Sequence, residues 1–72
     1  MAVVKEIFSP SKLYKAEIIK REDGLFHTDV FGWDDEWECW LQVSRDFSLT
    51  DTQYNGEKVA IEKLRNCSGE NI

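Results

Sequence analysis

The Asp23-Gly24 dipeptide, between two segments of alternating polarity, is the feature that most constrains the fold of this chain. Asp-Gly favours a turn, because glycine adopts a positive φ without steric cost. Residues 13–20 and 25–33 each divide into two sets of side chains with the period of two that is typical of a strand. The sequence therefore predicts an antiparallel hairpin over residues 13–33.

The length of the loop decides which side chains share a face of this hairpin. A two-residue turn at 23–24 would place Ile18 opposite Asp29, whereas a three-residue loop at 22–24 places Ile18 opposite Thr28. A slip of one residue moves every side chain of a strand to the other face. We predict the three-residue loop with a left-handed glycine, because it keeps the apolar side chains of the two strands together.

The same reasoning predicts a third strand over residues 36–45, joined by a two-residue turn at Asp34-Asp35 that pairs Trp33 with Glu36. The face expected to form the core then comprises Tyr14, Ala16, Ile18, Phe26, Val30, Trp37, Cys39, Leu41 and Val43. If Trp37 belongs to this core, its replacement by alanine should cost about 3–5 kcal/mol of stability. Trp40→Ala should cost much less in a monomer.

A helix is predicted over residues 50–67. The tetrapeptide Thr50-Asp51-Thr52-Gln53 fits a capping box with Thr50 as the N-cap, and Gly69 fits a helix stop. The apolar stripe of this helix comprises Tyr54, Ala60, Ile61, Leu64 and Cys67. Gly56 lies at the edge of the stripe and costs about 1 kcal/mol of helix propensity relative to alanine. Its presence indicates either a close approach to the sheet or simple tolerance.

These elements predict one small α+β domain over residues 1–72. Its architecture is a three-stranded antiparallel meander within residues 13–45, packed on one C-terminal helix over residues 50–67 in the order β-β-β-α. Residues 1–12 are expected to add a short N-terminal strand, a docking arm or a disordered tail. Residues 68–72 are expected to fray.

The acidic balance of the chain argues against binding to nucleic acid. The net charge is −5, and residues 22–57 carry ten Asp and Glu but one Arg. The β-β-β-α order is similar to that of double-stranded RNA-binding modules, but such modules contact phosphates through basic residues. A nucleic-acid-binding module is therefore the alternative, and a protein partner is expected. No apolar run approaches the roughly 20 residues of a membrane span, and the N-terminus lacks a secretory pattern, so we expect a cytoplasmic protein without a membrane segment.

No residue pattern typical of a catalytic or metal site is present. His27 and Asp29 could form an acid–base pair, with Gln42 expected opposite His27, but no activated nucleophile completes it and Ser44 is the nearest hydroxyl by position. The two cysteines form no CxxC pair and, with one histidine, are too few for a structural zinc site. The carboxylates of residues 34–38 lack the spacing of an EF-hand. We predict no enzymatic activity, no metal and no cofactor.

The opposite face of the predicted sheet keeps six large apolar residues, which are Leu13, Ile19, Leu25, Phe31, Trp33 and Trp40. Exposed apolar patches of this size tend to mark interaction sites. Three explanations remain open: residues 1–8 cover this face, a second copy covers it, or a different protein binds there. The candidate binding residues are Phe31, Trp33, Trp40, His27, Asp34, Asp35, Glu36 and Glu38. The sequence thus favours a non-enzymatic protein-interaction domain, with a homodimer as one form of it.

Overall fold

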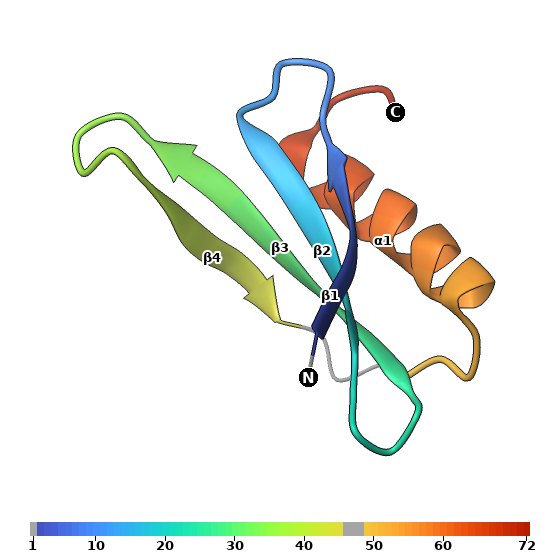
Figure 1. The fold of residues 1–72 in the computed structure, drawn as a ribbon. Helices are drawn as coiled ribbons and strands as arrows, with labels where there is room; N and C mark the ends of the chain where they lie inside the picture. The colour runs from blue at the N-terminus through green and yellow to red at the C-terminus, as the bar shows by residue number, and fades with distance from the viewer. Residues whose placement is uncertain (1, 46–48) are drawn as a thin grey trace.

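The computed structural model describes residues 2–45 and 49–72 and shows four antiparallel strands in one sheet, with one C-terminal helix on a single face (Figure 1). The elements are β1 (Ala2–Phe8), β2 (Tyr14–Lys20), β3 (Phe26–Asp34), β4 (Cys39–Arg45) and α1 (Gln53–Ser68). The strands lie side by side in chain order. The predicted α+β class is confirmed, and residues 2–8 form the additional N-terminal strand. Met1, which belonged to the predicted N-terminal strand or arm, lies outside the described residues. The connection 46–48 lies outside them as well.

The hairpin of β2 and β3 has the predicted register. Ile18 lies opposite Thr28, and Ala16 lies opposite Val30. The loop 22–24 is closed by a hydrogen bond from the Arg21 N–H to the Leu25 carbonyl, at 2.8 Å. Gly24 has φ +85°, a left-handed conformation that suits glycine. The three-residue loop is therefore confirmed.

The core lies between α1 and the two central strands. Its buried apolar side chains are Ala16, Ile18, Phe26, Val30, Ala60 and Leu64. Gly56 faces the sheet, where a Cβ would lie 3.4 Å from Cγ2 of Ile18 and 3.5 Å from Cβ of Phe26. Of the two explanations offered for this glycine, the close approach of helix to sheet is the one that the structure supports.

The ends of α1 differ in part from the prediction. Thr52, not Thr50, is the N-cap, and its hydroxyl accepts a hydrogen bond from the Asn55 N–H at 3.2 Å. Thr50 instead extends the sheet, because it exchanges two backbone hydrogen bonds with Phe26. Gly69 ends the helix with φ +70°. Beyond it, the side chain of Ile72 packs against the core.

The hairpin of β3 and β4 is longer than predicted. Asp34 lies opposite Cys39 and Trp33 opposite Trp40, so residues 35–38 form a four-residue loop. The physical reason is the Asp34 side chain, whose Oδ1 accepts the backbone N–H of residue 36 at 2.9 Å and of Trp37 at 3.0 Å. The predicted two-residue turn and the strand start at residue 36 are therefore wrong. Trp37 lies in the loop with 74% of its surface exposed, so its assignment to the core is wrong as well.

Strand β4 has apolar side chains on the helix side, but the helix does not cover them. Leu41 lies opposite Gly32, which in turn lies opposite Tyr14 of β2 on that face. A helix is about 10 Å wide and spans roughly two strands spaced 4.8 Å apart. Because α1 packs mainly on β2 and β3, Leu41 and Val43 remain 46% and 51% exposed. The predicted facing of these two side chains holds, but their predicted burial does not.

Candidate interaction surface on the outer sheet face

The sheet face opposite α1, called the outer face below, carries an aromatic cluster formed by Phe8, Phe31, Trp33 and Trp40. Trp33 and Trp40 lie opposite each other across β3 and β4, with ring centroids 5.3 Å apart in an edge-on arrangement. Phe8 at the end of β1 contacts Trp40 edge-on, with centroids 6.1 Å apart. All four strands thus contribute to or border a single patch of rings.

Lys15 of β2 lies at the centre of this aromatic cluster. Its Nζ lies 4.9 Å from the centroid of the Trp40 ring and 5.7 Å from that of Phe31. The same ammonium group bonds Glu6 at 2.8 Å and Glu17 at 3.0 Å. Burial lowers the pKa of Lys15, but the hydrogen bonds and charges of the two carboxylates outweigh it, so this pKa is raised above its ordinary value. Lys15 is therefore a charged group that holds the rings and the carboxylates in one network.

Sequence reasoning did not recognise this role of Lys15, although its signal was present. The predicted three-residue loop already places Lys15 directly opposite Phe31, and the structure confirms that pairing. A lysine opposite an aromatic residue on one face of a sheet can stack over the ring. What the sequence did not provide was the position of β1, whose Glu6 and Phe8 complete the network.

A row of carboxylates crosses the outer face next to the aromatic cluster. Glu6, Glu17 and Asp29 are successive cross-strand neighbours on β1, β2 and β3. Like charges in directly opposite positions repel each other, and Lys15 offsets this repulsion at the first two. Asp29 is only 8% exposed, and its Oδ1 has no hydrogen-bond partner among the described residues. The outer face therefore has acidic as well as aromatic character.

The expected grouping around His27 is realised only in part. His27 Nε2 lies 3.8 Å from Oδ2 of Asp29, an ion pair only when the histidine is protonated. Gln42 lies opposite Phe31 and not opposite His27, because the second hairpin is longer than predicted. Ser44 lies opposite Val30, on the face that carries the helix. The histidine and this hydroxyl are therefore on different faces of the sheet.

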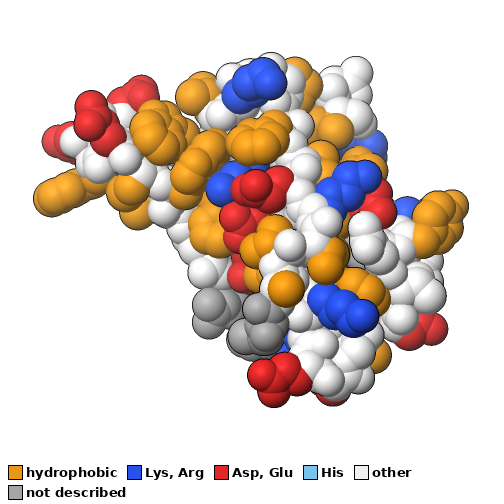
Figure 2. All heavy atoms as spheres, viewed as in Figure 1, with side chains coloured by type: hydrophobic (Ala, Val, Ile, Leu, Met, Phe, Trp, Pro, Cys, Tyr) orange, Lys and Arg blue, Asp and Glu red, His pale blue; other side chains and the backbone are white. Residues whose placement is uncertain are grey.

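The acidic loop between β3 and β4 projects at the end of the hairpin, and Figure 2 shows its acidic side chains beside hydrophobic ones. Of the four carboxylates in residues 34–38, two have structural partners. Asp34 accepts the loop N–H groups, and Asp35 accepts a 2.8 Å hydrogen bond from the Trp33 indole N–H. The latter bond fixes the Trp33 ring at the border of the loop and the aromatic cluster. Apart from His27, the predicted site residues thus form two adjoining parts, one aromatic and one acidic.

The N-terminal strand leaves the outer face open. Residues 2–8 pair edge to edge with β2 and extend the sheet, so the hypothesis that they fold over the outer face is wrong for these residues. Only the Phe8 ring is seen to join the aromatic cluster. Trp33 and Phe8 remain 37% and 44% exposed. The explanations that remain are a second copy or a different protein.

Neither similarity to known proteins nor the arrangement of possible metal ligands indicates what this surface does. No protein-family model matches the chain, and no curated protein or solved structure matches it significantly. Within residues 2–45 and 49–72, no three His, Cys, Asp or Glu side chains are arranged to hold a metal ion. No helix in the same residues has the length and apolar character to cross a membrane. The function of the outer face must therefore be inferred from its own residues and contacts.

Proposed function

We propose that this domain is a non-enzymatic protein-binding module and that the outer face is its docking surface. The observation that carries the proposal is the aromatic cluster, which lies on a face that neither α1 nor β1 covers. Tryptophan is among the residues that contribute most to binding energy at protein interfaces. Two neighbouring tryptophans on an uncovered sheet face are therefore suited to anchor a partner.

The rings are held in place before any partner arrives. Trp40 is fixed by Trp33, Phe8 and Lys15, and the Trp33 indole is fixed by Asp35. Side chains that are already ordered lose little conformational entropy on binding. The ordered rings of the cluster are therefore better suited to binding than exposed rings that move freely would be.

Charge indicates the chemistry of the partner. Residues 22–44 contain seven Asp and Glu and no Lys or Arg. Complementary charge steers association and excludes partners of the wrong sign. The partner should therefore combine apolar side chains with Lys or Arg. Phosphates would be repelled by the same residues, so nucleic acid is not favoured.

The proposal is tested by site-specific photo-crosslinking in cells. A benzophenone amino acid replaces Leu13, whose carbonyl accepts the Trp33 N–H at 2.8 Å and which therefore lies beside the aromatic cluster. The matched control carries the same group at Tyr54, an exposed aromatic residue on α1. We expect a discrete protein adduct from position 13 that disappears when Trp33→Ala is added, and no such adduct from position 54.

Two results would overturn the proposal. One is the absence of an adduct at position 13 in a folded, expressed variant. The other is an adduct that is equally strong at both positions or insensitive to Trp33→Ala. The mass of the adduct also identifies its origin, because a crosslink to a second copy doubles the mass of the chain.

A further inference from the structure

The two edges of the sheet are protected to very different degrees. An edge strand exposes backbone N–H and C=O groups that can pair with another chain, and charged side chains and bulges normally discourage this. β1 carries both devices, since Lys5 and Glu6 lie at its middle and a bulge lies at Val4. β4 carries a bulge at Val43, but it has no charged residue from Cys39 to Ser44.

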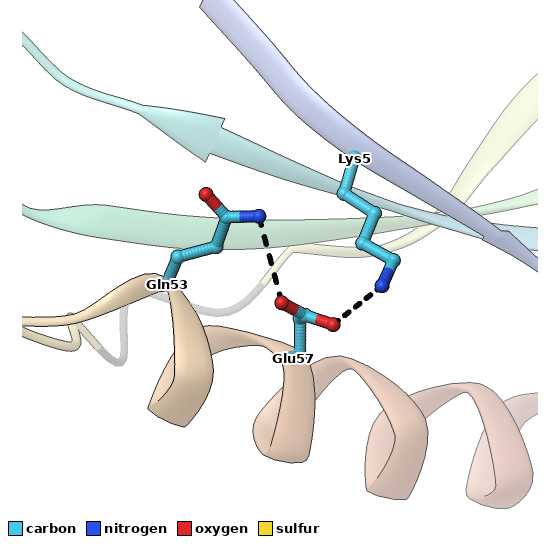
Figure 3. A network of polar contacts seen from close by, with 3 residues as sticks. All are labelled: Lys5, Gln53 and Glu57. Carbon is cyan, nitrogen blue, oxygen red and sulfur yellow. Dashed lines mark hydrogen bonds and ion pairs between the residues drawn. The ribbon is translucent and has the colours of Figure 1, made fainter.

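The side chains on the helix side also differ between the two edge strands, and again those of β4 are less protected. Beside β1, Lys5 bonds Glu57 of α1 at 2.6 Å, and Gln53 contacts the same carboxylate (Figure 3). This ion pair joins the strand to the helix at this edge, and the Lys5 hydrogen bond lowers the pKa of Glu57. Beside β4, the exposed side chains are Leu41 and Val43. An uncharged edge thus coincides with an uncovered apolar strip.

We propose that β4 pairs antiparallel with β4 of a second copy, which joins two sheets into one of eight strands. Such a two-fold interface is self-complementary, as in the commonest class of soluble oligomers. It pairs the outer edge of β4 in each copy with that of the other. It also brings the Leu41 and Val43 strips of the two copies together on the helix side. This proposal goes beyond the docking function and does not depend on it, because it uses the edge of the sheet.

The acidic residues before β4 favour antiparallel over parallel pairing of two copies. Residues 34–38 contain four carboxylates and directly precede the strand. Antiparallel pairing places these acidic segments at opposite ends of the interface, whereas parallel pairing would place them side by side, where they repel. The strand therefore supplies both the backbone partner and the apolar partner of its own edge.

The dimer is expected to be weak. The bulge at Val43 limits the regular part of the edge to residues 39–42. Interfaces that bury less than about 1,200 Å² are typical of weak or transient association. Dimerisation should therefore depend on protein concentration.

The test is sedimentation equilibrium over a wide concentration range with a matched pair of variants. Val43→Lys and Val4→Lys make the same chemical change, at the bulges of β4 and β1 respectively. Val43→Lys should raise the dimer dissociation constant at least about tenfold, because it sets a charge against the apolar strip of the other copy. Val4→Lys should leave the constant unchanged, and circular dichroism checks that both variants fold.

A second measurement locates the interface. In a mixture of isotope-labelled and unlabelled wild-type protein, intermolecular NOEs should connect the methyl groups of Leu41 and Val43 with β4 of the other copy. A monomer at every concentration would overturn the inference, as would a dimer that Val43→Lys leaves intact. An adduct or its absence in the Leu13 crosslinking experiment bears on the docking function alone, so the two proposals fail separately.

Discussion

Trp40 should contribute far more to stability than Trp37, which reverses the order expected from sequence. Trp40 is half-buried on the outer face and contacts Trp33, Phe8 and Lys15. Trp37 is exposed in the acidic loop, and its backbone N–H, not its ring, is bonded to Asp34. Replacement by alanine should therefore destabilise the domain at Trp40, whose ring packs in the cluster, and change its stability little at Trp37, whose ring is exposed.

The magnitudes follow from these contacts. Edge-on aromatic pairs contribute about 0.5–1.5 kcal/mol each beyond the area they bury, and an exposed cation–π contact adds about 0.5–1 kcal/mol. With two such pairs and the contact to Lys15, Trp40→Ala should lower the free energy of unfolding by about 1.5–4 kcal/mol. Trp37→Ala should change it by no more than about 0.5 kcal/mol, as is usual for an exposed side chain without special contacts.

Urea unfolding followed by far-UV circular dichroism is the appropriate assay, because removal of a tryptophan alters the fluorescence signal itself. Trp33→Ala serves as an internal control and should cost less than Trp40→Ala, since Trp33 makes one of the two ring contacts. A Trp37→Ala loss equal to or larger than that of Trp40→Ala would contradict these assignments of the two rings. It would mean that the loop ring packs on the body of the domain.

Three further perturbations test the local structure. Thr52→Ala should cost about 1 kcal/mol through loss of the N-cap, and Thr50→Ala should cost less, as urea unfolding would show. Asp34→Ala should cost about 1–2 kcal/mol because two loop N–H groups lose their acceptor, and Asp34→Asn should restore most of it. The Lys15 hydrogen bond lowers the pKa of Glu6 below its ordinary value of 4.5. The stability that this bond provides is present above pH 4.5 and is lost as pH falls through the folded-state pKa, so Glu6→Gln should flatten the acid limb of a stability–pH curve.

The first hairpin was predictable because its signals are local and agree with each other. A left-handed glycine after Asp23 fixed the loop, and the facing of Ile18 with Thr28 fixed the register. The second hairpin was not, because the decisive interaction is made by a side chain. Asp34 bonds two loop N–H groups and thereby stabilises a longer connection. Alternation alone cannot distinguish that loop from a continued strand.

The error in the second hairpin spread to the candidate site. A strand that starts at Cys39 instead of residue 36 removes Trp37 from the pleat and places it in the loop. It also moves Gln42 away from His27. Phe31, Trp33 and Trp40 were nevertheless assigned to the correct face, because the longer loop moves the partner of Cys39 from Val30 to Asp34, an even shift that keeps each side chain on its face. The contacts among these rings could not be predicted, because they depend on the register of β4 against β3.

The width of one helix against four strands determines which surfaces remain open. α1 covers the two central strands. The side chains of the two edge strands on the helix side must therefore make other contacts or remain exposed. β1 makes such a contact through the Lys5–Glu57 ion pair, whereas β4 presents Leu41 and Val43 to solvent. α1 leaves the outer face uncovered (Figure 1), and the rings on that face are organised by Lys15, a residue that packing alone would not require. An uncovered edge explains why β4 should pair with another strand, and an uncovered, ordered cluster explains why the outer face should bind a partner. The two surfaces lie on different sides of the same strand, so an edge dimer would leave both outer faces free.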